Sequence, residues 1–591
     1  MSFTDLRQFL KHLEEKGDLA RVSREVSPVE EVTIIHHRVI KAGGPALLFE
    51  RVKGSPYRMV TNLFGTQERV DAVFGRAPSE IGAELAGLGE RLAPPTLRNL
   101  WGSRSTLKKF VRARTRVVNN GPILNQAFEP PDLHELPILK CWPLDGGSFI
   151  TLPLVHTVDP VTSVGNLGMY RLQRFDATST GMHWQIEKGG AFHFLNAKKQ
   201  GIPLNVSVFL GGPPALVLAA IAPLPEGIDE KMLAALLIGR PLDVIARTTT
   251  GHQIPAKAEF VLEGSVKGGD VRREGPFGDH FGHYSHAADY PVFRVDRVLA
   301  RKDAIYPATV VGKPCQEDFF IGHALQQMTI PLLKVMRPGI CDLWGYPETG
   351  FHPLAVLSVK ERYPREAFKY AFSVLGEGQL SLTKVVVVVD QAVNVKDFTE
   401  VSNALYRNLD SEDGLHLIAP TCQDTLDFTG PAMNTGSRLV LIATEKGTGP
   451  LRTTRPPAPP PGPEVHPQIE ALERLGDAFL MAKVKEGAAK DAVKEALLAH
   501  AVTRQYLFQV MVSNDVPLDD MVMVLWGWFT RFDPLNDLYP EKRDVIGNRV
   551  VLRFPIAIDA TWKEGYPKPV AFDPGLERRV NSQWDTYGIK L

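Results

Sequence analysis

The chain has 591 residues, of which 44% are apolar and 23% charged, a composition typical of soluble globular proteins with several domains. Basic and acidic residues both number 67, so the net charge is zero and a broad nucleic-acid-binding surface is not expected. No run approaches the roughly 20 apolar residues of a membrane helix. The opening MSFTDLRQFLKHLEEKGD predicts a helix and not a signal peptide, because no apolar segment follows a basic one.

The cysteines are scattered and form no CxxC pair. In a chain of this length they indicate reduced, mostly buried thiols in a cytoplasmic protein. They are Cys141, Cys315, Cys341 and Cys422.

Residues 1–115 have the pattern of a mixed α/β domain. Thr4 is a candidate N-cap for a first helix, and Gly17 is expected to end it. A second helix is expected over residues 29–41, and a buried strand over residues 46–49.

Residues 116–315 change to short β-prone runs separated by turns, which is typical of an antiparallel barrel or sandwich. One helix is expected to begin at Asp229. The β-prone runs are FITLPLVHTV, LNVSVFL, ALVLAAI, EFVLEGSV and YPVFRVDRVLA.

Residues 316–452 return to an α/β pattern, with TIPLLKVM, HPLAVLSV and TKVVVVVD as predicted buried strands and PREAFKYAFSVLG as a helical connection. Residues 453–591 begin with a Pro-rich linker at 453–463. Amphipathic helices are then expected from residue 465 to about residue 500.

Two short echoes connect these last regions. GSRLVLIATEKG at 436–447 is similar to FPIAIDATWKEG at 554–565, and residues 397–410 are similar to residues 520–533. The echoes indicate either an internal duplication or chance.

Two carboxylates, Glu274 and Asp279, lie five residues apart in REGPFGDHFGHY. In a strand this spacing would place them on opposite faces, but a GPFG turn can fold both toward one pocket. One carboxyl could then stay ionised beside an arginine, for which Arg171 is a natural candidate, while the other is held protonated as an acid. Two surface acids on a solvated turn are the alternative.

Ligand-type side chains are concentrated in NLGMYRLQRFDATSTGMHWQIEKGG, residues 166–190. With Glu230, the residues Asn166 and His183 offer oxygen and nitrogen ligands that suit Mn²⁺ or Mg²⁺ better than structural zinc. Side chains of these types are common at wide spacing, so the sequence alone leaves this site open. Three clustered histidines are either a second candidate metal site or simply loop residues beside the carboxylate turn: His280, His283 and His286.

Motifs of other enzyme classes do not fit the chain. Neither Gly189-Gly190 nor Gly211-Gly212 matches GxGxxG or GxxxxGK[ST], so a Rossmann or P-loop nucleotide site is not expected. No serine stands in a GxSxG nucleophile elbow.

Taken in order, the motifs resemble the UbiD family of non-oxidative decarboxylases of aromatic and α,β-unsaturated acids. DLRQFLKHLEEKGDL, KAGGPALLFE and NLFGT are similar to the family's N-terminal domain, and NLGMYRLQ with MHW and KGG is similar to its cofactor loop. PEGIDEKMLAALLIGRPLDVI, IPAKAEFVLEG and EGPFGDHFGHY follow in the family's order. The resemblance covers roughly residues 1–446, with a second match near the C-terminus.

The resemblance implies an N-terminal α/β domain, a central split β-barrel of the flavin-reductase type, and a C-terminal α/β domain with a helical extension. It also implies a prenylated FMN cofactor, with its phosphate held through Mn²⁺ and K⁺. The positions that match metal ligands are Asn166, His183 and Glu230. The other positions that match the cofactor lining are Met169, Tyr170, Arg171, Trp184, Gln185, Lys188 and Gly189.

Arg171, Glu274 and Asp279 match the catalytic arginine and two acids of the family. In the implied mechanism, Arg171 orients the substrate carboxylate and pairs with Glu274, and Asp279 protonates the ring carbon after CO₂ leaves. His183 stands where some quinone-pathway members carry Arg, and Asp279 stands where other members carry Glu.

The length, the Pro-rich linker and the ending RRVNSQWDTYGIKL resemble the longer quinone-pathway members of the family. Among these, the members of menaquinone biosynthesis that use a dihydroxynaphthoate-type acid are the most similar. A 4-hydroxy-3-polyprenylbenzoate of ubiquinone biosynthesis is the alternative substrate. A non-catalytic flavin- or metal-binding subunit of a carboxylase assembly, and a plain FMN reductase, are alternatives of other classes.

The resemblance also implies partners. A separate flavin prenyltransferase would supply the cofactor, and the chain is expected to form a homo-oligomer, as family members often do through C-terminal elements. The candidate interface residues, which a buried domain core would explain equally well, are Leu497, Leu498, Tyr506, Leu507 and Phe508.

Overall fold

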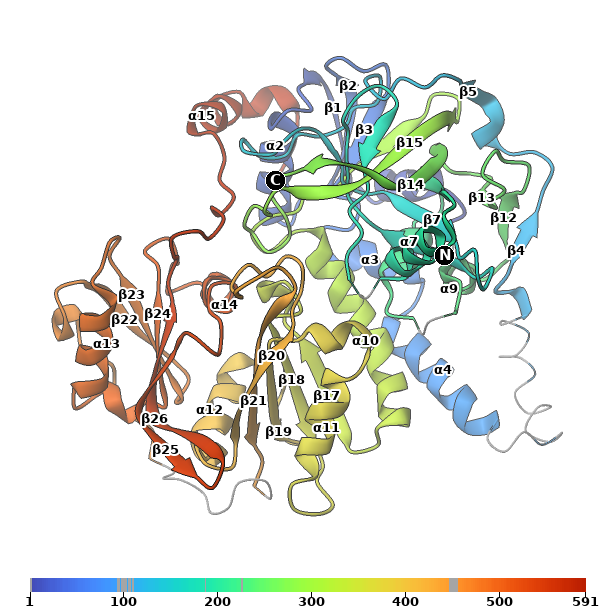
Figure 1. Cartoon of the computed structure of the whole chain (residues 1–591). Coiled ribbons are helices and arrows are strands. Elements are labelled where there is room, and N and C mark those ends of the chain that lie inside the picture. Colours follow the sequence, from blue (N-terminus) through green and yellow to red (C-terminus); the bar gives the residue numbers. More distant parts are fainter. Residues whose placement is uncertain are drawn as a thin grey trace. The chain divides into compact units, whose positions relative to one another are not determined.

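The computed structural model of the chain describes residues 3–92, 96, 104, 108, 111–186, 188–224, 227–445 and 455–591. The chain forms two compact units, which we describe separately (Figure 1). Unit 1 contains residues 1–329 and 568–591, and unit 2 contains residues 330–567. In the described part of the chain, no helix is long and apolar enough to cross a membrane.

Unit 1 begins with a four-stranded sheet of order β1-β2-β3-β16. Its last strand, β16 (Ile305–Pro307), comes from residues 116–315, the region expected to form the barrel, and pairs in parallel with β3. The first helix is capped by Asp5 and not by Thr4, because the Asp5 carboxylate accepts a hydrogen bond from Gln8 N at 2.9 Å. The other elements are α1 (Leu6–Glu15), β1 (Leu19–Val26), α2 (Glu31–Lys41), β2 (Ala46–Val52), β3 (Arg58–Thr61), α3 (Gln67–Phe74) and α4 (Pro78–Leu92).

A seven-stranded sheet forms the centre of unit 1, in the order β10-β15-β14-β11-β7-β8, with β5 also paired to β15. The strands β14 (Phe260–Glu274) and β15 (Ala288–Ala300) form a long antiparallel hairpin. The loop between them, residues 275–287, contains Asp279. The remaining strands are β4 (Thr115–Val117), β5 (Gln126–Phe128), β6 (Phe149–Ile150), β7 (Leu154–Val158), β8 (Gly165–Met169), β9 (Leu172–Gln173), β10 (Ser179–Gly181), β11 (Leu204–Leu210), β12 (Leu242–Ile245) and β13 (Ile254–Pro255).

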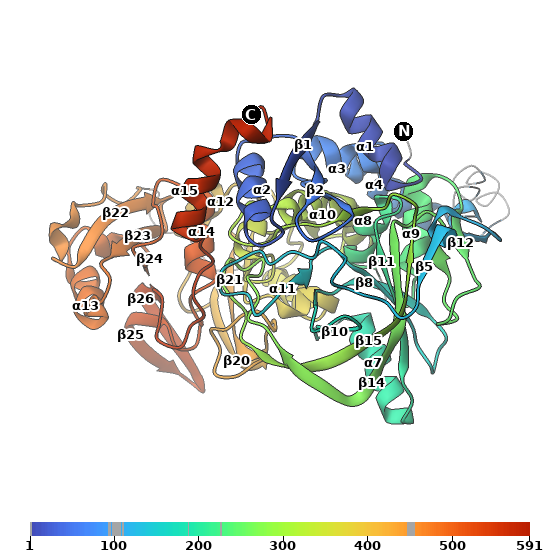
Figure 2. The same ribbon diagram turned by 90° about the horizontal axis from the view of Figure 1, so that it is seen from above.

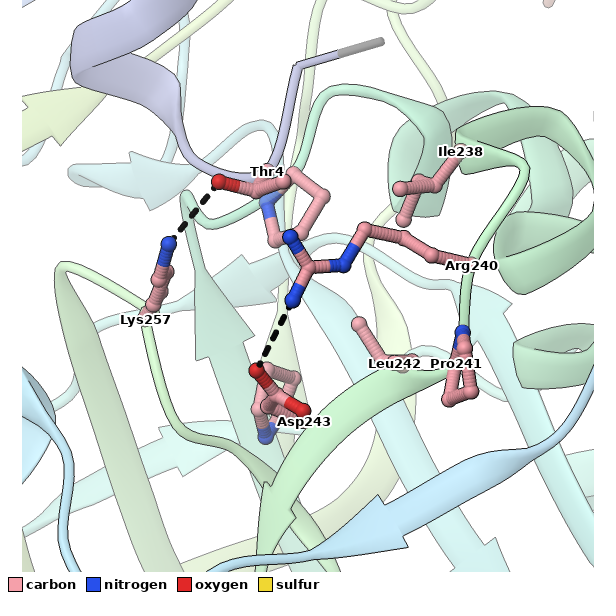
Figure 3. A pocket seen from close by; sticks show the side chains of 9 residues that line it. Thr4, Ile238, Arg240, Pro241, Leu242, Asp243 and Lys257 are labelled. Atoms are coloured by element: carbon pink, nitrogen blue, oxygen red, sulfur yellow. Dashed lines mark hydrogen bonds and ion pairs between the residues drawn. The ribbon is translucent and has the colours of Figure 1, made fainter.

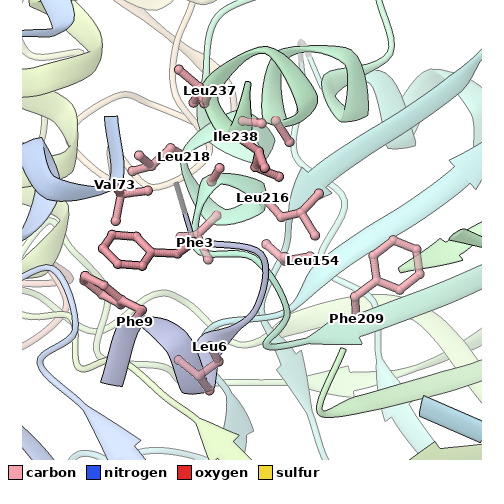
Figure 4. Packing of buried hydrophobic residues seen from close by; sticks show 14 of the residues in the cluster. Phe3, Leu6, Phe9, Val73, Leu154, Phe209, Leu216, Leu218, Leu237 and Ile238 are labelled. Carbon is pink, nitrogen blue, oxygen red and sulfur yellow. The ribbon is translucent and has the colours of Figure 1, made fainter. Parts of the chain in front are cut away.

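A shared hydrophobic core joins the N-terminal helices of unit 1 to this central sheet (Figure 4). Phe9 of α1 and Val73 of α3 belong to it, together with Leu154 of β7. The same core includes leucines of α8 (Ala215–Ile221) and α9 (Glu230–Ile238). The helix α9, which supplies Glu230, is therefore anchored by burial of its apolar residues.

Two of the predicted β-strands, ALVLAAI and TIPLLKVM, form helices in the structure. ALVLAAI forms α8, and because all of residues 215–219 are buried, the run carries no periodicity that could separate helix from strand. TIPLLKVM forms the end of α10 (Glu317–Met336), although Pro331 lies inside that helix. The Thr329 hydroxyl donates to Leu325 O at 3.0 Å within the helix, an interaction that the sequence pattern does not reveal.

Unit 2 contains two five-stranded sheets, of order β17-β18-β19-β21-β20 and β22-β23-β24-β26-β25. The first consists of β17 (Ile340–Gly345), β18 (Leu354–Val359), β19 (Val385–Asp390), β20 (Leu415–Cys422) and β21 (Thr435–Ala443), with helices α11 (Glu366–Leu375) and α12 (Phe398–Asn408). The second consists of β22 (Ile469–Leu475), β23 (Phe479–Val484), β24 (Phe508–Val512), β25 (Leu538–Ile546) and β26 (Arg549–Ala560), with α13 (Lys490–Ala499) and α14 (Met521–Phe529).

Of the amphipathic helices predicted over residues 465–500, only α13 forms, because residues 469–484 form two strands. The expected helical extension is therefore a mixed α/β region. A register shift between Ile469 and Ala471 in β22 leaves Ile469, Leu472 and Leu475 buried. Leu472 and Leu475 lie on opposite faces of the strand, Leu472 in the core with α13 and Leu475 in the core shared with the first sheet. The bulge and the burial of both faces together give this strand the apolar spacing of a helix. The boundary expected at residues 452/453, the first residues of the Pro-rich linker, and residues 446–447 of the first echo lie outside the described residues.

Residues 568–591 return to unit 1. Residues 568–570 lie beside the 275–287 loop, where Tyr284 N donates to Lys568 O at 3.0 Å and Val570 N donates to Gly282 O at 3.0 Å. The helix α15 (Pro574–Ser582) packs on α2, as Figure 2 shows. Beyond it, the Tyr587 hydroxyl donates to the Glu31 carboxylate at 2.7 Å.

We expect the substitution Tyr587→Phe to loosen this C-terminal segment. The change removes a buried hydrogen bond to a carboxylate, which typically contributes about 1–2 kcal/mol. Amide exchange in α15 should therefore become roughly 5- to 30-fold faster. Hydrogen–deuterium exchange with mass spectrometry measures this effect, with Tyr363→Phe at a half-exposed position as the control. Unchanged exchange in α15 would show that the hydroxyl does not hold the segment.

Candidate active site

Arg171 lies between β8 and β9, where its guanidinium group has three side-chain partners. Its Nε lies 3.2 Å from Glu274 Oε1, its Nη1 contacts Asp279, and its Nη2 donates to Ser285 Oγ at 3.0 Å. The Phe277 ring lies 4.9 Å from the guanidinium carbon. With its side chain only 8% exposed, Arg171 is fixed in orientation and retains its charge.

The two carboxylates converge because β14 ends at Glu274 and the chain turns at once. Gly275 has a φ of 90°, a conformation that favours glycine, and Gly278 N donates to Asp145 Oδ1 at 2.8 Å. Asp279 N then donates to His283 O at 3.1 Å, which closes the turn. The two acids therefore contact the same arginine although they are five residues apart.

Both carboxylates are ionised in this arrangement. Burial raises the pKa of Asp279, but the Arg171 charge and the hydrogen bonds from His280 outweigh it and hold the pKa well below its ordinary value. Burial likewise raises the pKa of Glu274, and the hydrogen bond from His183 with the Arg171 charge lowers it further than burial raises it. Neither group is thus a ready-protonated acid while both face Arg171, in contrast to the expectation of one protonated member.

His183 connects this ion pair to the rest of the site. Its Nδ1 lies 2.9 Å from Glu274 Oε1, and burial together with the Arg171 charge lowers its pKa, so the ring is neutral. An ionised Glu274 can only accept, so Nδ1 carries the proton and Nε2 keeps its lone pair. Nε2 is buried and has no hydrogen-bond partner among the described residues. A carboxylate that orients a histidine in this way is a common support for a metal-binding imidazole.

A second group of predicted residues gathers around β8 and the start of α7 (Gly189–Gln200). Glu230 Oε2 accepts from Leu167 N at 2.7 Å, next to Asn166 in the chain. A Cβ on Gly189 would lie 2.1 Å from Asn166 Oδ1, so only glycine allows this close approach. Burial raises the pKa of Glu230 to about 7. A cation beside Asn166 and Glu230 would favour the ionised carboxylate.

Tyr170 and Trp184 lie between the two groups. The Tyr170 hydroxyl accepts from Gly190 N at 3.2 Å and lies 3.5 Å from Asn166 Nδ2. The Tyr170 and Trp184 rings meet edge to face at 5.2 Å, and Trp184 Nε1 is buried with no hydrogen-bond partner in the part of the chain that the structure describes. The remaining predicted lining residues, all partly exposed, are Met169, Gln185 and Lys188.

The residues present fit a flavin phosphate and a divalent metal. Buried polar atoms of His183, Trp184 and Glu274 have no hydrogen-bond partner within the described ranges and could bind polar groups of a ligand. The two glycines that begin α7 place a helix N-terminus beside Asn166. Among the described residues, no group of three or more His, Cys, Asp or Glu side chains is close enough to hold a metal ion by itself.

The three loop histidines have different environments. His280 Nδ1 lies 2.7 Å from Asp279 Oδ1, His283 is buried with Nδ1 3.1 Å from Phe281 O, and His286 is exposed. A small surface pocket near Arg240, Asp243 and Lys257 contains none of the predicted site residues (Figure 3).

Sequence reasoning missed several residues that support this site. Ser285 binds Arg171, and Tyr290 packs against His183 with ring centroids 4.2 Å apart and the ring planes tilted by 34°. Asp145 holds the turn through Gly278 N, from more than a hundred residues away in the chain. No sequence motif connects Asp145 to the turn. Ser285, in contrast, is the last residue of EGPFGDHFGHYS and could have been considered as a site residue from the sequence.

Comparison with known protein families identifies three matches along the chain. Residues 10–88, 115–314 and 319–443 match the N-terminal, Rift-related and C-terminal domains of 3-octaprenyl-4-hydroxybenzoate carboxy-lyase, UbiD. A protein of Chlamydia muridarum is 40% identical over 587 residues, covering 98% of this chain and 99% of the relative. A Chlamydia pneumoniae protein, named as a subunit of 4-hydroxybenzoate decarboxylase, is 40% identical over 590 residues, covering 99% and 98%.

Solved structures of decarboxylases are also similar. The vanillic acid decarboxylase of Sedimentibacter hydroxybenzoicus in its closed form superposes with a TM-score of 0.68 at 25% identity, covering 78% of this chain and 97% of that one. The UbiD-class enzyme HmfF of Pelotomaculum thermopropionicum in complex with FMN has a TM-score of 0.62 at 26% identity, covering 74% and 94%. An evolved dimeric form of HmfF in complex with prFMN has a TM-score of 0.60 at 26% identity, covering 75% and 95%.

The three domain matches and the full-length relatives show that the chain belongs to the UbiD family of carboxy-lyases.

Proposed function

We propose that the protein decarboxylates an aromatic acid without net oxidation, with prenylated FMN as its cofactor. The observation that carries this proposal is the position of Arg171, whose side chain is only 8% exposed and is held between Glu274 and Asp279. An arginine in this setting can bind a planar carboxylate through two parallel hydrogen bonds. The two acids can in turn hold the guanidinium in place, and one of them can supply the proton that replaces CO₂.

Arg171 would bind and orient the carboxylate of the substrate. Its Nη1 now contacts Asp279, and a substrate carboxylate would compete for the same donor. Glu274, bonded to Nε and to His183, would keep the guanidinium in place while this exchange occurs. The Phe277 ring beneath the guanidinium would limit its movement to one plane.

Asp279 would supply the proton. Its pKa is low because it faces Arg171, so a substrate carboxylate that takes over Arg171 would let this pKa rise and Asp279 accept a proton. The C–C bond to the carboxyl group then breaks, CO₂ leaves, and the electron pair remains on the ring carbon. Asp279 would transfer its proton to that carbon and be reprotonated from solvent.

The cofactor would supply an acceptor for the electron density that decarboxylation leaves on the ring. Asn166, His183 and Glu230 would hold Mn²⁺ at its phosphate, with K⁺ nearby, and the glycines opening α7 would let the phosphate approach the backbone. Tyr170 and Trp184, with Met169, Gln185 and Lys188, would line it. The similarity to HmfF structures that contain FMN and prFMN supports this assignment.

For the substrate we propose a dihydroxynaphthoate-type acid of menaquinone biosynthesis, on the sequence resemblance to the longer quinone-pathway members. A 4-hydroxybenzoate-type acid is the competing substrate, supported by the name of the Chlamydia pneumoniae relative. The central sheet of unit 1 and its match to a Rift-related domain support the split flavin-reductase-like barrel that the resemblance implies.

A second candidate function is that of one component in a larger decarboxylase. The name of the Chlamydia pneumoniae relative describes it as one subunit of its enzyme, and the structure ShVdcCD contains a further protein, ShVdcD. In this case the chain would bind the cofactor but need a partner for turnover.

The deciding experiment starts with the protein co-expressed with a flavin prenyltransferase and supplied with Mn²⁺. Mass and absorption spectra of the released small molecule should show prenylated FMN, and the holoenzyme should release CO₂ from the naphthoate acid faster than from the benzoate acid. Faster release from the benzoate would overturn the substrate assignment. Cofactor binding without CO₂ from either acid would favour the role as one component of an assembly, and a protein without flavin would contradict the proposal.

The substitution Asp279→Asn should keep the cofactor and lower turnover about 10²- to 10⁴-fold, because an amide has no transferable proton. The measurements are flavin content and deuterium incorporation at the ring carbon in D₂O. Asp289→Asn, at a side chain that is 64% exposed, is the matched control. Normal turnover in Asp279→Asn would remove this residue from the mechanism.

The substitution Glu274→Gln should lower the affinity for Mn²⁺ about 10- to 100-fold although Glu274 is not itself a proposed ligand. A glutamine amide can donate to His183 Nδ1 and so favour the tautomer that carries its proton on Nε2. Titration of free Mn²⁺ by electron paramagnetic resonance measures the affinity, and Glu135→Gln at an exposed loop position serves as the control. Equal affinities would show that Glu274 does not set the tautomer.

A further inference from the structure

The two sheets of unit 2 have the same topology. In each, the first strand pairs antiparallel with the second, the second and third strands are parallel, and the third pairs in parallel with the last. The fourth strand in the chain pairs antiparallel with that last strand at the sheet edge. Each sheet also has one helix between its second and third strands and another after its third, as Figure 1 shows.

The correspondence extends to individual residues. Leu354 pairs with Val385 in the first sheet, and Phe479 pairs with Phe508 in the second. As many positions separate Val385 from Asp397 as separate Phe508 from Asp520. Both aspartates are N-caps, since their carboxylates accept backbone N–H bonds at the start of α12 and α14.

The irregularities recur as well. The first strand of each sheet has a register shift at the same place, between Ile340 and Asp342 in β17 and between Ile469 and Ala471 in β22. Leu439 of β21 and Ile556 of β26 are equivalent, because each pairs with the first residue of the third strand of its sheet. This structural alignment differs by one position from the sequence alignment of the echo, residues 436–447 with residues 554–565. Shared bulges are not expected from two unrelated sheets of one class.

One face of each sheet packs in a separate hydrophobic core, and the other face contributes to a core that both sheets share. The helix α11 covers a core with residues of the first sheet only, and α13 covers a core with residues of the second only. The opposite faces, which carry α12 and α14, contribute to one continuous core. The residues considered as an external interface belong to the buried interior of this second half, apart from the half-buried Leu498: Leu497, Tyr506, Leu507 and Phe508.

Aromatic rings fill this shared core. Phe398, the first residue of α12, lies 5.7 Å from Phe479, 5.9 Å from Trp528 and 6.1 Å from Phe529, measured between ring centroids. All three partners belong to the second half. Such contacts bury large apolar areas from both halves at once.

Polar contacts fix the same pairing. The Ser402 hydroxyl of α12 donates to Leu475 O at 2.6 Å and accepts from Ala478 N at 3.1 Å, both in the turn between β22 and β23. Asp477 N donates to Asn403 Oδ1 at 2.9 Å in the same turn. In the reciprocal direction, α14 packs on the turn between β17 and β18, at residues 347–349. The two halves thus contact each other through equivalent helices and equivalent turns.

We infer that residues 463–567 are a second copy of the domain formed by residues 340–444, and that this copy is a built-in partner covering the α12 face of the first. The family matches end at residue 443, so the second copy lies outside them. Any homo-oligomer of the protein therefore uses other surfaces than the α12 and α14 faces.

The test is hydrogen–deuterium exchange of the full-length protein carrying Trp528→Ala. Removal of this ring should make amide exchange in α12, which belongs to the other copy, about tenfold or more faster. Because the partner is in the same chain, the exchange rates of both proteins should be the same at about 1 µM and about 100 µM. The milder substitution Trp528→Phe should give a smaller effect in the same helix, and replaces the alanine variant if that does not fold.

The matched control is Leu497→Ala, which removes a buried side chain from the face that the second copy keeps for itself. It should speed exchange in α13 and leave α12 close to the unmodified protein. Unchanged α12 exchange in the Trp528 variants, or an equal effect of Leu497→Ala on α12, would overturn the face-to-face pairing. Exchange in α12 that slows as the protein is concentrated would show that the partner is a second chain.

Discussion

The ion pair between Arg171 and the two acids of one turn is the interaction on which the site depends. A buried guanidinium is costly unless its donors are satisfied, and here Glu274, Asp279 and Ser285 satisfy it. Glu274 also fixes His183, so the charge on one side of the site determines which imidazole nitrogen is free on the other. In the proposed function, substrate binding, proton supply and metal binding would therefore be coupled through Arg171 and Glu274.

This coupling gives the pKa of Asp279 its meaning. In isolation, a low pKa would exclude an acid role, but the low value comes from Arg171, whose charge a carboxylate substrate would share. In the proposed mechanism, the correct ligand itself would thus create the acid. The second domain copy in unit 2 is a comparable case, since it provides from the same chain the surface that covers the α12 face of the first copy.

Much of the fold was predictable from the sequence because strands such as TKVVVVVD and HPLAVLSV have simple patterns, and because turn residues bring Glu274 and Asp279 together. The failures have identifiable causes. The bulge in β22, together with burial of both faces of that strand, imitates helical spacing, and the uniform burial of α8 removes all periodicity. Asp145 and residues 568–570 support the catalytic turn through contacts that are distant in sequence, which no local pattern encodes. The ionised state of Asp279 depends on three-dimensional proximity to Arg171 and could not be read from spacing.

The return of residues 568–591 to unit 1 has a consequence for synthesis. Unit 2 is inserted in the chain between the loop that carries Asp279 and the segment that pairs with that loop at Gly282 and Tyr284. During translation the N-terminal part of unit 1 leaves the ribosome first, but the edge of its catalytic turn stays unpaired until the whole of unit 2 has emerged. The turn that carries both acids is therefore among the last parts of the molecule to be completed. A nascent chain that stalls within unit 2 would contain Arg171 and both acids without residues 568–570, which bond to their loop.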